Sequence, residues 1–371
     1  MVRISLALIA TLILVGSAPA EWSHDPFENT RVPGYSGYAT WPVSVTDGRG
    51  GAIVAWIGTQ GTDDRLFVQR FDADGEKMWG DNGLIVVNPA GEIGDMRMVS
   101  NDNGGAYVCW QEIGPSEPGV LYAQHVSYQG QELWPAGGVR VCANSSYQNY
   151  PQIAPVGDGG LFCVWESGQE LSADIYAQRL SPSGTLTWSA DGARVCSATS
   201  AQYSPRVVGD GASGIYVVWR DFRNGPGDIF AQRLDAQGSR YWVSNGIQLD
   251  QSYDNSYEPA AATAADGQLL VAWSDDDNVI IQKIAGDGTA SWGVGGIPWF
   301  GDLLWPAGLL AMPDGGAVLA YTRWQNELGS LLGQRFAADG SPTWGNGDPV
   351  ILVGGDGGKK EKAAEKGHEL V

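Results

Sequence analysis

The chain has 371 residues, of which 42 are acidic and 22 are lysine or arginine, and its formal net charge is −20 at pH 7. Such a surface repels phosphate groups, so neither nucleic acid nor an anionic membrane is an expected partner. Histidine occurs only at His24, His125 and His368, which leaves no well-placed residue for a histidine-dependent catalytic triad.

The first 20 residues predict a secretory signal peptide. Arg3 precedes an apolar run from Ile4 to Val15, and small residues follow at Ala18–Ala20, so cleavage is expected near Ala20. The apolar run is too short to cross a bilayer comfortably. We therefore expect a secreted protein, extracellular or periplasmic, with no membrane span.

The remaining chain divides into three parts. Residues 21–40 form a lead segment that is too short for a further repeat, and we expect it to cap the repeats or to pair with the last of them. Residues 41–353 show no shift in composition, which indicates one domain, and we expect a monomer. Residues 354–371 mix lysine with glutamate and predict a charged, flexible tail.

Six copies of one unit fill residues 41–353, with a period of about 50 residues. Each copy contains an apolar run that ends at an aromatic residue, then a second run with a glutamine, and then a tryptophan. The aromatic landmarks are Trp56, Trp110, Trp165, Trp219, Trp273 and Tyr321; the glutamines are Gln69, Gln124, Gln178, Gln232, Gln282 and Gln334; the tryptophans are Trp79, Trp134, Trp188, Trp242, Trp292 and Trp344. The expected copies span approximately 41–90, 95–145, 150–199, 204–252, 258–300 and 305–353.

Each copy reads as four antiparallel strands. In the fourth copy "GIYVVW" is rich in β-branched and aromatic residues, and "DIFAQRLD" places Ile229, Ala231 and Arg233 on one face. Stacked or radial repeats of this length are typical of propellers, with a solenoid as the alternative. We expect an all-β, six-bladed β-propeller whose blades close into a ring, because neither terminal segment is long enough for a seventh sheet.

Three stretches carry a resemblance to a known fold family. "MPDGG" from Met312, "WRDFRNGPGDIF" from Trp219 and "DIYAQRLSPSG" from Asp174 resemble the repeat of TolB-like six-bladed propellers, and the resemblance covers all six copies in layout. The chain is also similar to exported bacterial proteins whose blades repeat "IYAQRLDxxGxxxW". The resemblance implies a propeller fold and an exported location, and it brings no catalytic residues.

The four cysteines fall in the second and third copies. None forms a C-x-x-C pair, so a zinc or redox motif has no support. Cys109 and Cys163 lie just before their landmark tryptophans, on neighbouring copies, and they either face each other or face away. A disulfide, if one forms, is expected to join these two; the alternative is four buried free thiols.

Asp-Gly and Asn-Gly dipeptides recur in the copies, for example at Asp47, Asn103 and Asp266. None has the Asp-x-Asp-x-Asp-Gly spacing that gathers oxygens around calcium, and hairpin turns explain them without a metal. We therefore expect neither a metal site nor a cofactor.

Candidate site residues lie where the copies differ, because positions shared by every copy serve packing. The positions after the landmark aromatic residue begin loops that we expect at the same end of the propeller as the aromatic connections between copies. Those connections brace the loops or contact a ligand. The candidate ligand-binding residues are Glu112, Glu166, Arg220, Asp221, Asp275, Arg323, Tyr150, Tyr203, Tyr257 and Trp305.

Two functions fit this face. Aromatic rings beside carboxylates and arginines suit recognition of a glycan or peptide, so the first hypothesis is a secreted binding module for a glycan, a peptide or a cell-envelope partner. The alternative is a hydrolase or lyase of extracellular polysaccharide that draws its catalytic groups from Glu112, Glu166, Asp221 and Asp275. The sequence alone leaves the ligand open.

Overall fold

The computed structural model describes residue 32 and residues 38–353, apart from 61–62, 90, 102, 115–118, 145, 170, 251–255, 277, 300–303 and 326–327. The expected signal peptide, most of the lead segment and the expected tail lie outside the described residues.

The described chain forms six four-stranded antiparallel sheets, as predicted, and each sheet is built from strands in sequence order. The first sheet contains β1 (Tyr38–Thr46), β2 (Ala52–Gln60), β3 (Asp63–Phe71) and β4 (Leu84–Val87). The second contains β5 (Glu92–Ser100), β6 (Ala106–Ile113), β7 (Val120–Val126) and β8 (Val139–Arg140). The third contains β9 (Gln148–Pro155), β10 (Leu161–Ser167), β11 (Asp174–Leu180) and β12 (Ala193–Cys196).

The second half repeats the same plan. The fourth sheet contains β13 (Gln202–Gly209), β14 (Ile215–Asp221), β15 (Asp228–Leu234) and β16 (Ile247–Gln248). The fifth contains β17 (Ser256–Thr263), β18 (Leu269–Asp275), β19 (Asn278–Ile284) and β20 (Ile297–Trp299). The sixth contains β21 (Leu304–Ala311), β22 (Ala317–Gln325), β23 (Leu328–Phe336) and β24 (Val350–Val353), with a short 3-10 helix at Trp344–Gly347.

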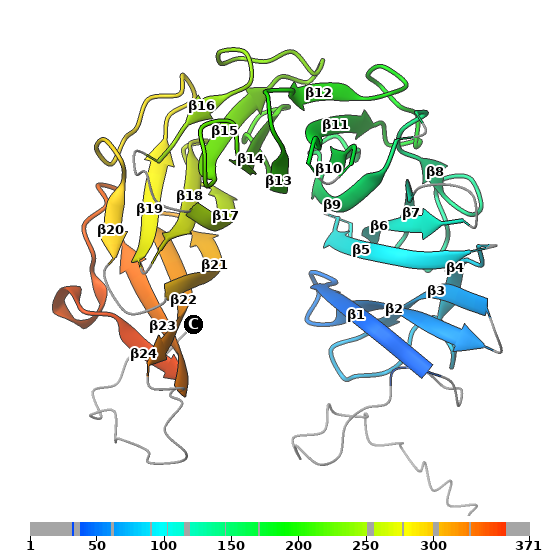
Figure 1. Ribbon diagram of the computed structural model, residues 1–371. Coiled ribbons are helices and arrows are strands. Elements are labelled where there is room, and N and C mark those ends of the chain that lie inside the picture. Colours follow the sequence, from blue (N-terminus) through cyan, green and yellow to red (C-terminus); the bar gives the residue numbers. More distant parts are fainter. Residues whose placement is uncertain are drawn as a thin grey trace, which may run out of the picture.

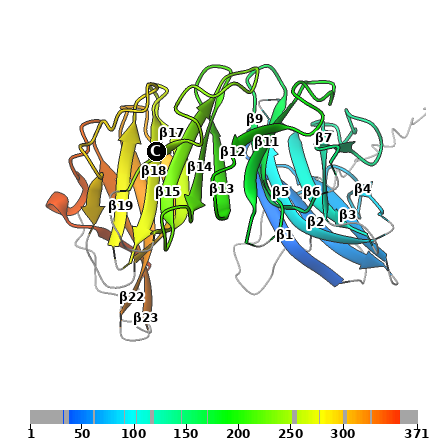
Figure 2. The same cartoon turned by 45° about the horizontal axis from the view of Figure 1, so that its top comes forward.

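The sheets are arranged radially, which makes the chain a β-propeller type of protein. The first strands of consecutive sheets contact one another, so β1, β5, β9, β13, β17 and β21 are the innermost strands. Figures 1 and 2 show the six sheets as an arc, with the first sheet at one end and the last sheet at the other. All extensive contacts between described sheets join consecutive sheets.

The expected closure into a ring is therefore not seen in this structure. The rotation from each sheet to the next, summed over the five contacts, does not bring the first and last sheets together (Figure 1). Hydrophobic side chains of the last sheet are exposed on both its innermost and its outermost strand, since Leu310 of β21 is 64% and Ile351 of β24 is 58% accessible to solvent.

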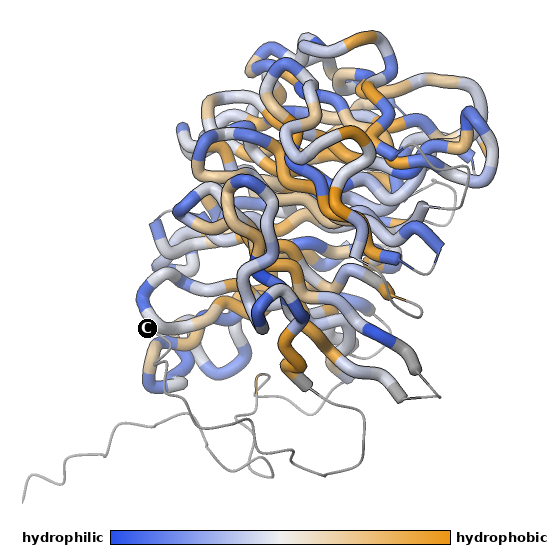
Figure 3. Tube along the Cα trace, turned by 90° about the vertical axis from the view of Figure 1, so that its left-hand side faces the viewer, coloured by the Kyte–Doolittle hydropathy of each residue, from blue (hydrophilic) through white to orange (hydrophobic). Residues whose placement is uncertain are grey.

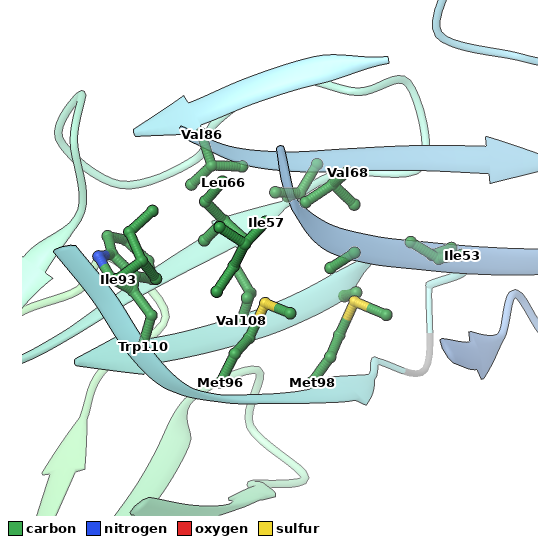
Figure 4. Packing of buried hydrophobic residues seen from close by; sticks show 13 residues of the cluster. Ile53, Ile57, Leu66, Val68, Val86, Ile93, Met96, Met98, Val108 and Trp110 are labelled. Carbon is green, nitrogen blue, oxygen red and sulfur yellow. The ribbon is translucent and has the colours of Figure 1, made fainter. Parts of the chain in front are cut away.

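The hydrophobic core lies between the sheets, because alternate residues of each strand face opposite neighbours. Figure 3 shows hydrophobic stretches running through the stack, with hydrophilic stretches at many turns. Between the first and second sheets, aliphatic side chains meet two methionines and a tryptophan (Figure 4). The labelled contacts there include Ile53, Ile57, Leu66 and Val68 from the first sheet and Met96, Met98, Val108 and Trp110 from the second.

The glutamine and tryptophan landmarks join one sheet to the next. In the fourth sheet the Gln232 side-chain oxygen accepts from the backbone N–H of Arg233 and of Trp242, each at 3.0 Å, and its amide nitrogen donates to the Val243 carbonyl at 2.8 Å. The Trp242 indole then donates to the Gly286 carbonyl of the fifth sheet at 3.1 Å. The same indole bond runs from Trp79 to Tyr128, Trp134 to Pro182, Trp188 to Ala236 and Trp292 to Ala338.

All four cysteines are buried and are free thiols. Cys109 and Cys163 belong to one core cluster between the second and third sheets, so the facing arrangement is the one that the fold adopts. Burial raises the pKa of Cys163 well above its ordinary value, and a hydrogen bond with Cys109 adds to this effect. The structure thus places the two thiols together and has all four cysteines as buried free thiols, which was the alternative to a Cys109–Cys163 disulfide.

Candidate functional site

The predicted loop positions and the connections between sheets lie on the same edge of the sheets, where the second strand of each sheet ends. Pairing within the sheets shows this directly, because Asn149 lies opposite Glu166, Tyr203 lies opposite Arg220 and Tyr257 lies opposite Ser274. Each pair joins an innermost strand to the end of the second strand. The two sets of candidate residues therefore belong to the same region of the molecule.

Every innermost strand has a register shift in this region, which is the signature of a β-bulge. Three bulge residues have left-handed backbone conformations, namely Trp41 (φ 54°), Tyr150 (φ 49°) and Ser204 (φ 53°), and each precedes a proline. Such a conformation costs a non-glycine residue about 1–3 kcal/mol and is concentrated at functional sites. Trp41 and Tyr150 nevertheless remain 62% and 53% exposed.

Glu166 is buried beside one of these bulges. It is only 5% exposed, and its Oε1 accepts from the backbone N–H of Ser204 at 2.7 Å. Burial raises the pKa of Glu166 to about 7, and the negative charge of Asp95 raises it further, whereas the Ser204 N–H and the positive charge of Arg206 oppose the rise. This carboxyl group can therefore both hold and release a proton near neutral pH.

Asp95 supports the neighbouring bulge in the same way, because its Oδ2 accepts from the backbone N–H of Tyr150 at 3.2 Å. Asp95 lies on β5, Tyr150 on β9, Glu166 on β10, and Ser204 and Arg206 on β13. Three consecutive sheets thus contribute to one group of residues. We call Asp95, Tyr150, Glu166, Ser204 and Arg206 the inner-strand cluster.

Arg220 continues this surface into the fifth sheet. Its guanidinium carbon lies 4.1 Å from the centre of the Tyr257 ring and 4.5 Å from that of Phe222, which are distances for cation–π contacts. Phe222 in turn meets Tyr203 edge to face, with ring centres 5.6 Å apart. The structure therefore brings together five of the predicted residues, Tyr150, Glu166, Tyr203, Arg220 and Tyr257.

Two other predicted carboxylates accept hydrogen bonds from the landmark tryptophans of their own sheets instead. Asp221 is completely buried, and it accepts from the Trp219 indole at 2.8 Å and from Nε of Arg223 at 2.8 Å. Glu112 is half-buried, accepts from the Trp110 indole at 3.0 Å, and has its pKa raised by burial. Their position two residues after the tryptophan lets each reach back to its ring, which gives these side chains a structural role.

The remaining predicted residues lie elsewhere. Asp275 is half-buried at the end of β18, opposite Asn278. Trp305 lies in β21, but its side chain is outside the described part of the chain. Arg323 lines a cavity of about 380 Å³ between the fifth and sixth sheets. Its lining consists of Pro298, Trp299, Leu304, Tyr321, Arg323, Gly347, Asp348 and Pro349.

Sequence reasoning missed Asp95, Ser204 and Arg206. A usable signal was present, because the copies differ at the residue before the proline of "TWPV", "NYPQ" and "YSPR", where the second copy has Asp95. The bulge that turns this position into a strained one is not evident from strand alternation. All three residues lie on innermost strands, whereas the sequence-based candidates came from the loops and from the aromatic connections.

No group of three or more histidine, cysteine, aspartate or glutamate side chains is arranged to hold a metal ion within the described residues. Nor does the described part of the chain contain a helix with the length and apolar character needed to cross a membrane.

No protein-family model matches the chain, and no curated protein matches it. Solved structures with a similar arrangement include a Dyadobacter fermentans protein of unknown function, with a TM-score of 0.44, 11% identity and coverage of 77% of this chain and 91% of that one. A Hadza microbial sialidase has a TM-score of 0.44, 14% identity and coverage of 76% and 62%. An α-L-arabinanase from Penicillium chrysogenum has a TM-score of 0.43, 13% identity and coverage of 77% and 89%.

Proposed function

We propose that the protein is exported and that its inner-strand cluster binds a polysaccharide. The observation that supports this most strongly is the pair of exposed aromatic side chains, Trp41 and Tyr150, at strained bulges of the innermost strands. Pairing of the strands does not require large exposed rings at these positions, and the left-handed backbone costs about 1–3 kcal/mol at each of them.

The chemistry of the cluster suits a sugar chain. Flat rings such as that of Tyr150 stack on the C–H faces of sugars, and nearby polar groups fix the orientation. Asp95 and Glu166 offer oxygen atoms and Arg206 offers N–H donors on strands adjacent to that ring. Since Trp41 occupies the equivalent bulge in the first sheet, contacts with more than one sugar unit are expected.

Affinity electrophoresis in gels that contain arabinan, galactan, mannan or an acidic polysaccharide tests this proposal. Tyr150→Ala should weaken binding to the retained polysaccharide about tenfold, the loss expected when one stacking contact is removed. Tyr241→Ala is the matched control, since Tyr241 is 58% exposed but lies in a turn away from the cluster. Equal effects of the two changes, or no retention in any gel, would contradict the proposal.

A second candidate function is hydrolysis of the bound chain, and the pKa of Glu166 near 7 favours it. A glycosidase needs one carboxyl group that is protonated at the working pH and a second that is ionised. Glu166 would donate its proton to the leaving glycosidic oxygen. Asp95 would accept a proton from the attacking water, so that the bond to the anomeric carbon breaks as the new C–O bond forms.

Release of reducing ends from the polysaccharide that is retained in the gel tests hydrolysis separately. Glu166→Gln should lower the rate by a factor of about 10² or more, because general acid catalysis contributes about 10²–10⁴-fold, while retention in the gel persists. Retention without release of reducing ends from the wild-type protein would reject the enzyme and leave the binding function in place.

A further inference from the structure

The cavity between the fifth and sixth sheets has features that the inner-strand cluster does not use. Its volume of about 380 Å³ lies within the range of about 300–1,000 Å³ that is typical of ligand pockets. Trp299 and two prolines supply apolar walls, and Tyr321, Arg323 and Asp348 supply polar groups. None of these residues belongs to the inner-strand cluster.

Tyr321 has an unusual hydrogen-bonding state. The Trp299 indole nitrogen lies 2.6 Å from the Tyr321 hydroxyl oxygen, and because an indole N–H only donates, the tyrosine oxygen accepts this bond. The phenolic proton is therefore directed elsewhere and can be donated to a molecule in the cavity. Burial raises the pKa of Tyr321, which keeps that proton in place at neutral pH.

Arg323 is the second donor. It is half-buried and lowers the pKa of Tyr321 through its charge, so the two groups are close, yet it forms no ion pair with any described residue. Some cations of the described chain are bound to aspartates, among them Arg70, Arg223, Arg233 and Lys283. In a chain with a net charge of −20, a guanidinium that lines a cavity beside a hydroxyl donor offers a position for an external anion.

We propose that this cavity binds the carboxylate of an acidic sugar, a uronate unit of the polysaccharide, which deepens the proposed function by naming its substrate class. Arg323 and the Tyr321 hydroxyl donate to the carboxylate. Trp299 contacts the sugar ring, and Asp348 at the exposed rim accepts from a ring hydroxyl. A guanidinium presents its N–H groups in a planar fork that matches a carboxylate.

The test uses the full chain and three small probes at low salt, D-glucuronate, D-glucose and acetate, with binding followed by ligand-observed saturation-transfer NMR. Glucuronate should bind, and glucose, which has the same ring without the carboxylate, should bind at least tenfold more weakly. Acetate should also bind at least tenfold more weakly because it lacks the ring. Arg323→Gln should weaken glucuronate binding at least tenfold, and Tyr321→Phe about three- to tenfold.

Tyr150→Ala is the matched control and should leave glucuronate binding unchanged, which separates this cavity from the inner-strand cluster. The thermal midpoint of each variant shows whether it folds. Equal binding of glucose and glucuronate, equal binding of acetate and glucuronate, or unchanged binding in a folded Arg323→Gln variant would overturn the proposal. Loss of polysaccharide retention in Tyr150→Ala with glucuronate binding intact would support both sites independently.

Discussion

Two buried carboxyl groups of this protein have different roles because their neighbours differ. Asp221 is completely buried and meets both the Arg223 guanidinium and the Trp219 indole. Glu166 is almost as buried, but it accepts a hydrogen bond from the Ser204 backbone, and Asp95 adds a negative charge nearby. Asp221 is therefore held by side-chain donors of its own sheet, whereas the pKa of Glu166 is raised to about 7 by burial.

The pH dependence of stability tests the state of Glu166. Its pKa rises from an ordinary value of 4.5 to about 7 in the folded chain, so the folded state favours the protonated form. That favourable contribution is complete below pH 4.5 and is lost as the pH rises through 7. Urea unfolding at pH 4.5 and pH 8 should therefore show that Glu166→Gln gains about 3 kcal/mol relative to wild type over this interval. A difference that does not change with pH would contradict the pKa shift.

The strained backbone at Tyr150 makes a second prediction. Its φ of 49° is unfavourable for any residue with a Cβ and is acceptable for glycine. Tyr150→Gly should therefore be about 1 kcal/mol more stable than Tyr150→Ala, although both remove the same exposed ring. Denaturant unfolding of the two variants measures the difference, and equal stabilities would show that the bulge carries no strain.

At the scale of the element, the glutamine and tryptophan of each copy work as a connector between sheets. The glutamine fixes the backbone of its own tryptophan, and the indole donates to a turn of the next sheet, as in the bond from Trp188 to Ala236 at 2.9 Å. Trp344 of the last sheet has the same backbone bond to Gln334 but no indole partner among the described residues. Both tryptophans are half-buried, and Trp188 also has a ring contact with Phe162, which a phenylalanine at position 188 can retain in part.

This difference supplies a matched pair of variants. Trp188→Phe removes the indole bond and part of the ring, whereas Trp344→Phe removes only part of the ring. Trp188→Phe should therefore lose about 1 kcal/mol more in free energy of unfolding, the net value of one hydrogen bond. Chemical denaturation compares the two, and a larger loss at Trp344 would mean that its indole has a partner in solution.

Much of the fold was predictable from the sequence, and much of the site was not. The alternation of apolar and polar residues and the recurring tryptophans predicted the sheets and their strands, because these features serve the packing that every copy shares. The loop positions and the connections were correctly placed at one end, since strand order determines it. The bulge at Tyr150 and the indole bond of Asp221 lie within single copies, but strand alternation does not indicate them. The burial of Glu166 and its contacts with Ser204 and Asp95 depend on how neighbouring sheets meet, and no single copy contains that information.

For the whole molecule, the extensive contacts among the described residues join consecutive sheets, and the sheets form an open arc (Figure 1). An end sheet has one neighbour and an inner sheet has two. In such repeat structures stability is approximately a sum of unit terms and nearest-neighbour terms. The sequence reasoning predicted the radial arrangement, but the angle between sheets, which decides closure, depends on side-chain volumes at each contact.

Amide hydrogen exchange tests this arrangement directly. Protection should be greatest in the third and fourth sheets and least in the first and sixth, because local opening begins where contacts are fewest. Peptides from β10 and β14 should therefore exchange more slowly than the equivalent peptides from β2 and β22. Uniform protection across all six sheets would indicate that the arc closes in solution.

The nearest-neighbour contacts also bear on how such a chain changes over evolutionary time. Because each sheet is complete within one copy and is joined to the next by the same indole bond, duplication of a copy adds a sheet without disturbing the contacts of the others. A closed ring would resist this, since its circumference fixes the number of blades. An open arc can lengthen by whole units, and its new inner strands extend the surface that carries the bulges.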